Sequence, residues 1–191
     1  MTPRVLVAGI GNIFLGDDGF GVEVANRLVA RPDATPSTVR VEDFGIRGVH
    51  LAYELLEGYD VLVLLDAVPM HEPPGTLAVI EVGTDLVAEP GDEPAPIMDA
   101  HSMSPATVLS LLAGLGGAGL GGQLQRILVV GCEPGTVEEG IGLSDAVVAA
   151  VEPAVALVEQ VLGDLLAEMA TETVAELHSR NNDPLERKAS A

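Results

Sequence analysis

The heptapeptide DVLVLLD, residues 60–66, is the clearest strand signal in the chain. A short continuous apolar run bounded by polar residues is typical of a strand that is covered on both faces. Similar runs predict four more strands, at residues 4–9, 38–44, 76–82 and 125–131. Helical patterns lie between most of them, at about residues 18–29, 50–56, 104–113 and 144–168. This alternation predicts an α/β domain with a mostly parallel sheet.

The link between the third and fourth predicted strands is too short for a parallel crossover. Nine residues separate Asp66 from Thr76, and Pro73, Pro74 and Gly75 are among them. A parallel connection needs about a dozen residues or more. We therefore expect the fourth strand to be antiparallel to the others.

Length and composition favour one domain with a tail. The chain has 191 residues, of which 48% are hydrophobic, enough to bury a core. We expect the domain to cover residues 1–168 and the polar segment 169–191 to be disordered. The sequence contains no uninterrupted apolar run of about 18 residues and no signal-peptide pattern at its start, so we expect a cytoplasmic protein that spans no membrane.

The charge balance limits the possible partners. Twenty-nine acids against nine lysines and arginines give a formal charge of −20. Such a surface repels phosphate backbones, so no nucleic acid is expected as a partner. It also disfavours anionic membranes. A basic partner, or one bound through a metal cation, suits it, although most of these charges are explained by solubility alone.

Three side chains at the expected carboxyl edge of the sheet could share a metal ion. Asp18 follows the first strand, Asp66 ends the third, and His101 lies in the loop before the third helix. Open α/β sheets bind ligands at this edge. Two carboxylates and an imidazole suit zinc, nickel, cobalt or cadmium. Each residue alone also has a structural explanation, as a turn or helix cap for the aspartates and as an ordinary loop histidine.

Other kinds of site find little support. The glycines after the first strand, Gly9 and Gly11, do not complete a GxGxxG motif because position 14 is Phe, and the sequence has no phosphate-binding GxxxxGK[ST] and no GxSxG elbow. Cys132, the single cysteine, rules out an internal disulfide framework and a Cys-based zinc site. It could act as a nucleophile supported by His101 and Asp66, but a small buried side chain is the commoner role.

The segment GIGNIFLGDDGFGVEVANRL, residues 9–28, resembles the N-terminal signature of the hydrogenase maturation endopeptidases. Further motifs of that family follow in order: DVLVLLDAV, PPGT before the fourth strand, the loop histidine, and VVGCEP with GIGLSDAVVAAV. The match covers about residues 4–162, and the combination is more specific than any single motif.

The resemblance implies a five-stranded α/β/α sandwich of the phosphorylase/hydrolase-like type. Its strand order is 2-1-3-5-4, with strand 4 antiparallel, in agreement with the short link. The implied activity is removal of the C-terminal extension from a [NiFe] hydrogenase large-subunit precursor after nickel insertion. That precursor is the implied partner, and the protein is expected to be a monomer.

The resemblance also assigns roles to individual residues. Asp18, Asp66 and His101 correspond to the metal ligands, with nickel supplied by the substrate and no permanently bound cofactor. Zinc or cadmium could replace nickel in crystals. The metal could polarise the scissile carbonyl, activate water, or only report that the substrate is loaded.

Four residues are expected to act on or bind the substrate. Asp17 or Asp43 could be the general base, and Asp17, Asp43, Gly45 and Arg47 are the expected substrate-binding residues. The chain departs from the family in having Asp18 where Glu is common and Arg47 in a turn that usually carries Thr. The alternatives are a metal-sensing assembly factor without catalytic activity and a Cys132-dependent hydrolase.

Overall fold

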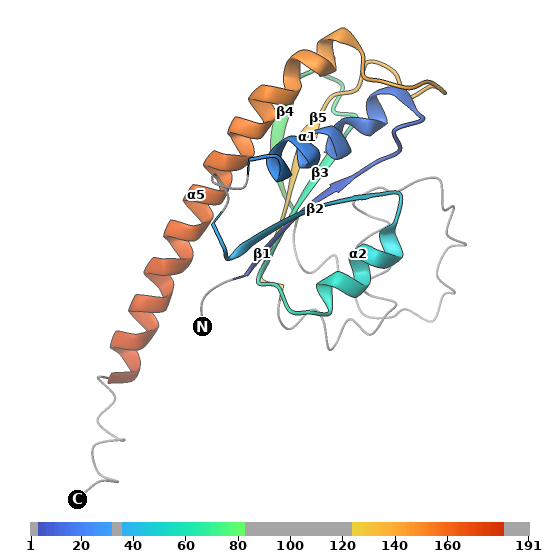
Figure 1. Cartoon of the computed structure of the whole chain (residues 1–191). Coiled ribbons are helices and arrows are strands. Elements are labelled where there is room, and N and C mark those ends of the chain that lie inside the picture. Colours follow the sequence, from blue (N-terminus) through green and yellow to red (C-terminus); the bar gives the residue numbers. More distant parts are fainter. Residues whose placement is uncertain (1–3, 32–35, 83–123, 182–191) are drawn as a thin grey trace, which may run out of the picture. The chain divides into compact units, whose positions relative to one another are not determined.

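The computed structural model describes residues 4–31, 36–82 and 124–181, with side chains as far as Thr171 (Figure 1). The helix expected at 104–113 and the candidate ligand His101 lie outside the described residues. The described elements are β1 (Val5–Ile10), the 3₁₀ helix η1 (Gly16–Gly19), α1 (Phe20–Val29), β2 (Val39–Gly45), α2 (Gly48–Leu55), β3 (Val61–Ala67), β4 (Leu77–Val82), β5 (Arg126–Cys132) and α5 (Asp145–Asn181).

The five strands form one sheet in the order β2-β1-β3-β5-β4. β1 pairs in parallel with β2 and β3, and β3 pairs in parallel with β5. β4 is antiparallel to β5, with Leu77 opposite Cys132. Both the mixed sheet and its strand order are therefore as expected, and each strand begins one residue later than its pattern predicted.

Helices cover both faces of the sheet. On one face, alternate β1 residues pack in a buried cluster with Leu51, Ala52 and Leu55 of α2. The opposite face carries α1. Arg27 in α1 and Arg31 just after it each form an ion pair with Glu152 near the start of α5. These layers give the expected α/β/α sandwich, and the sheet's carboxyl edge lies where β1, β2, β3 and β5 end.

The last helix is longer than expected. α5 continues through Pro153 without a break and ends at Asn181, well beyond residue 168. The expected disorder from residue 169 is therefore wrong as far as Asn181. Residues 169–181 contain neither Gly nor Pro and are rich in helix formers, so nothing local ends the helix.

The contacts divide the chain into two compact units, Met1–Ala156 and Leu157–Ala191. The sheet, α1, α2 and the first turns of α5 belong to the first unit, and the second contains the rest of α5. By length and composition alone, Asp145–Thr171 could cross a membrane, a test that the core helix of a soluble protein also passes.

Two glycines allow α1 to lie very close to the sheet. A Cβ on Gly21 would stand 2.0 Å from the carbonyl oxygen of Leu65 and 2.5 Å from that of Ile10. A Cβ on Gly9 would stand 2.5 Å from the Cβ of Ala25. Only hydrogen fits at these contacts, so the start of α1 is held against the ends of β1 and β3.

Gly21→Ala should destabilise the protein by about 3 kcal/mol or more, because backbone atoms must move to admit the methyl group. Gly163→Ala is the matched control, since Gly163 is also helical and a Cβ there meets nothing within 4 Å. The control should gain roughly 0.5–1 kcal/mol from helix propensity. Denaturant unfolding of both variants measures this, and equal effects would contradict the close packing of α1.

Candidate functional site

The candidate site lies where the chain reverses its winding direction in the sheet. β2 lies on one side of β1 and β3 on the other, so the connections after β1 and β3 diverge at this edge. Such switch points are the usual ligand sites of open α/β sheets. Gly11 follows β1 with φ +124°, and a Cβ there would stand 1.9 Å from the carbonyl oxygen of Asp18. Gly11 thus lets the GDDG turn fold back over the end of β1.

Asp17 is a buried structural residue. Its side chain is 0% exposed. Its Oδ2 accepts hydrogen bonds from the backbone N–H of Gly135 (2.8 Å) and Thr136 (3.0 Å) and from the Ser144 hydroxyl (2.9 Å). Its Oδ1 accepts the Ser144 backbone N–H at 2.6 Å. Burial acts to raise the pKa of Asp17, but the hydrogen bonds from Ser144, Thr136 and Gly135 outweigh it and hold the pKa below 3.8.

These contacts argue against the role expected for Asp17 in substrate binding or as general base, which stays a prediction. Both oxygens are occupied, and the depressed pKa makes the carboxylate a poor base. Asp17 does not cap α1 either, because that helix begins at Phe20 with no side-chain cap at its N-terminus. Asp17 instead joins the GDDG turn to the loop between β5 and α5.

Asp18 and Asp66 interact at the edge of the sheet. Asp18 is half-buried, and its Oδ2 accepts the Asn12 backbone N–H at 2.6 Å. Asp66 is 4% exposed. Burial and, second, the charge of Asp18 raise its pKa to about 8, while a hydrogen bond from the Ala67 N–H opposes the shift. Two negative charges on these carboxylates would repel each other, and a bound cation would offset that repulsion.

The third expected ligand cannot be placed. His101 lies outside the described residues, and no group of three metal-binding side chains occurs within residues 4–31, 36–82 and 124–171. The structure therefore brings Asp18 and Asp66 into electrostatic contact, and the three-ligand set remains a prediction.

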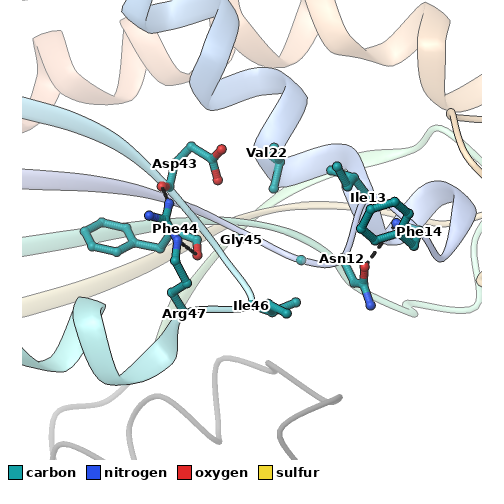
Figure 2. A pocket seen from close by; sticks show the side chains of 10 residues that line it. Asn12, Ile13, Phe14, Val22, Asp43, Phe44, Gly45, Ile46 and Arg47 are labelled. Carbon is teal, nitrogen blue, oxygen red and sulfur yellow. Dashed lines mark hydrogen bonds between the residues drawn. The ribbon is translucent and has the colours of Figure 1, made fainter.

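A groove of about 380 Å³ opens at the ends of β1 and β2, and Asn12, whose N–H donates to Asp18, is among its lining residues. Its walls are the loop carrying Asn12, Ile13 and Phe14 and the turn from Asp43 to Arg47, which face each other in Figure 2. Asp43 Oδ1 is buried and has no hydrogen-bond partner among the described residues. The groove is thus an apolar channel with one unsatisfied acceptor.

The turn after β2 forms one wall of the groove. Gly45 has φ +52°, a conformation that favours glycine, and its carbonyl accepts the Gly11 N–H at 3.1 Å. Arg47 donates from Nε to the Phe44 carbonyl at 3.0 Å and from its guanidinium to the Asp43 carbonyl (Figure 2). Arg47 therefore stabilises its own turn, a structural role that the sequence analysis did not foresee. It is also exposed and lines the groove.

Cys132 lacks the properties of a nucleophile. It is fully buried, and burial together with the charge of Asp17 raises the pKa of its thiol to about 11. A thiol needs an accessible, low-pKa environment to react. The structure therefore favours the interpretation of Cys132 as a core residue.

Glu133 is a buried acid that the sequence analysis gave no role. It is 8% exposed, and its Oε2 accepts the backbone N–H groups of Met70 (2.5 Å) and Glu72 (3.2 Å). These bonds hold the loop after β3, in which His71 has φ 64°. The sequence signal that could have identified Glu133 is an acid at the end of an apolar run, the same pattern that singled out Asp66.

Without a bound cation, the raised pKa of Asp66 should make folding stability fall as pH rises. Its pKa is 3.8 in the unfolded chain and about 8 when folded, so the folded state binds the extra proton between these values. Stability from this group is complete below about pH 4 and is lost by about pH 8, at up to about 1.4 kcal/mol per pH unit.

Asp66→Asn removes this titration, so its stability should fall less than wild type between about pH 5 and pH 8. Asp164→Asn, at an exposed helix position, is the control. Urea unfolding in the presence of a chelator measures the difference. Parallel stability profiles for Asp66→Asn and wild type would show that the Asp66 pKa is not raised.

Comparison with known proteins agrees with this architecture. The family model described as hydrogenase maturation protease matches residues 22–161. The hydrogenase 2 maturation protease of Escherichia coli K12 is 33% identical over 168 residues, covering 85% of this chain and 90% of the relative. The hydrogenase expression/formation protein HupM of Azotobacter chroococcum is 34% identical over 157 residues, covering 82% and 70%.

Solved structures agree as well. The hydrogenase maturating endopeptidase HybD of E. coli has a TM-score of 0.61 and 28% identity, covering 86% of this chain and 93% of that one. The hydrogenase 2 maturation peptidase of Thaumarchaeota archaeon SCGC_AB-539-E09 has a TM-score of 0.60 and 31% identity, covering 84% and 98%. With the sheet order and the GDDG turn already described, these matches show that the chain belongs to the hydrogenase maturation proteases.

Proposed function

We propose that the protein removes the C-terminal extension of a [NiFe] hydrogenase large-subunit precursor after nickel has been inserted. The supporting observation is the Asp18–Asp66 pair at the switch point of a maturation-protease fold, where Asp18's charge contributes to the raised pKa of Asp66. A site built to hold two carboxylates together suits a cation that arrives with the substrate. The protein would then act as a cytoplasmic monomer with no resident cofactor.

Nickel is the metal of the proposed substrate, and Asp18, Asp66 and His101 are its proposed ligands in the complex. Asp66 is protonated at neutral pH until a cation arrives, so binding of the ion displaces a proton. Precursor without nickel offers no such cation. This difference gives the protease a physical means to distinguish loaded from unloaded substrate.

The groove is the proposed binding place of the extension. An extended peptide can lay apolar side chains against Ile13 and Phe14, which are both exposed there. Asp43 lines the groove, and its buried Oδ1 lacks a donor among the described residues, so this carboxylate is not fully committed to contacts within the fold. Asp43 therefore replaces Asp17 as the proposed general base, with Gly45 and Arg47 forming the wall beside it.

Asp66→Asn and His101→Ala should each abolish cleavage of nickel-loaded precursor, because each removes a proposed ligand. Intact-mass analysis of the precursor after incubation measures this directly. Asp66→Asn is nearly isosteric, so its unfolding curve should show a folded protein. Normal cleavage by either variant would remove that residue from the mechanism.

Cys132→Ser is the control that separates the proposal from a cysteine hydrolase. The buried thiol takes no part in the proposed reaction, so the variant should cleave at the wild-type rate per folded molecule. Complete loss of cleavage in a folded Cys132→Ser protein would favour the cysteine mechanism. Failure of wild type to cleave, with tight binding of the loaded precursor, would favour a metal-sensing assembly factor.

Arg47→Ala should slow cleavage and also lower stability. Removing the guanidinium leaves the Asp43 and Phe44 carbonyls without two donors, at a cost of about 1 kcal/mol. Arg47→Lys keeps the charge but not the forked donors. We expect both variants to raise KM for the precursor, measured beside the melting temperature. Wild-type kinetics in both would leave Arg47 with only its structural role.

A further inference from the structure

An apolar surface extends from the groove across a second loop at the same edge. We call it the rim platform and define it as residues 13–14 together with residues 136–141. Its large apolar side chains are exposed: Phe14 by 61%, Val137 by 53% and Ile141 by 84%. Clustered exposed apolar side chains mark interaction sites more often than scattered ones do.

Backbone hydrogen bonds join the two loops of the platform. The Gly140 N–H donates to the Phe14 carbonyl at 2.9 Å, and the Gly16 N–H donates to the Gly140 carbonyl at 3.0 Å. Leu15 and Gly140 accordingly form a parallel bridge. One of the loops is further fixed by Asp17, whose N–H donates to the Thr136 carbonyl at 3.0 Å. The platform is therefore ordered before any partner binds, which lowers the entropic cost of association.

Acidic side chains accompany the apolar ones. Glu138 and Glu139 are exposed and form no ion pair with the described residues. Among residues 136–141 there is no basic residue. A partner that fits this surface presents an apolar patch bordered by lysine or arginine.

We propose that the rim platform is a second contact for the folded body of the precursor, separate from the groove that takes its extension. This inference rests on the proposed function. Phe14 belongs to both surfaces, since it lines the groove and its carbonyl accepts the Gly140 N–H. A protein whose C-terminal extension occupies the groove therefore has its folded body next to the platform. Specificity for one large subunit would then depend on residues 137–141 as well as on the groove.

Ile141→Glu and Val137→Glu test the proposal. Each places a charge in the centre of the proposed contact while leaving Asp18, Asp66 and Asp43 unchanged. We expect KM for nickel-loaded precursor to rise about tenfold or more in each, with kcat unchanged. Val29→Glu is the matched control, because Val29 is also 53% exposed and lies at the other end of α1 from the site. It should leave both constants unchanged.

The acidic residues are tested separately. The double variant Glu138→Gln, Glu139→Gln should raise KM at low salt and reduce the dependence of KM on ionic strength. Ile141→Ser repeats the apolar test without adding charge, and melting temperatures confirm that each variant is folded.

The outcomes separate this inference from the proposed function. Binding of loaded precursor to wild type and variants is also measured as Kd, which needs no cleavage. Weakened binding by Ile141→Glu but not by Val29→Glu supports the platform even if wild type fails to cleave, which would overturn only the proposed function. Equal Kd and KM in Ile141→Glu, Val137→Glu and Val29→Glu would overturn the platform. A wild-type dimer that the Ile141→Glu substitution dissociates would also overturn the proposal, because a second copy of the chain would then occupy the platform.

Discussion

The site depends on the buried carboxylate of Asp17. It accepts four hydrogen bonds from residues 135–144, more than a hundred positions away in the sequence. Removing the carboxylate would break all four bonds and leave a gap where the fully buried Asp17 side chain now lies. The same contact fixes the GDDG turn and the loop after β5. The position of Asp18, and in our proposal the platform, both follow from it.

The second constraint is the close approach of α1 to the sheet. Glycine at position 21 brings the helix against the carbonyls of Leu65 and Ile10. Asp18 lies in η1, two residues before the start of this helix, and Asp66 immediately follows Leu65 in β3. The backbone packing therefore places the two carboxylates together, and burial and, second, the charge of Asp18 raise the pKa of Asp66. In our proposal, a cation bound between the two carboxylates removes their repulsion.

The sequence was sufficient to predict the sheet, because apolar runs and loop lengths are local signals. The nine residues between Asp66 and Thr76 were enough to predict the antiparallel β4. The sequence could not show that Asp17 is a structural residue, because the groups that bind its carboxylate lie more than a hundred positions away. Arg47 shows the same limit, since its contacts with backbone carbonyls have no signature in side-chain types. The end of α5 was misjudged because polarity was taken to mean disorder, although the segment contains no helix breaker.

In our proposal, nickel is the signal that the substrate is ready for cleavage. The most direct measurement is the intact mass of the large-subunit precursor after incubation with wild-type protein, with nickel-loaded and nickel-free precursor compared side by side. We predict loss of the C-terminal extension from the loaded precursor and an unchanged mass for the nickel-free form. Equal cleavage of both forms would contradict the proposed role of Asp18 and Asp66 in sensing the metal.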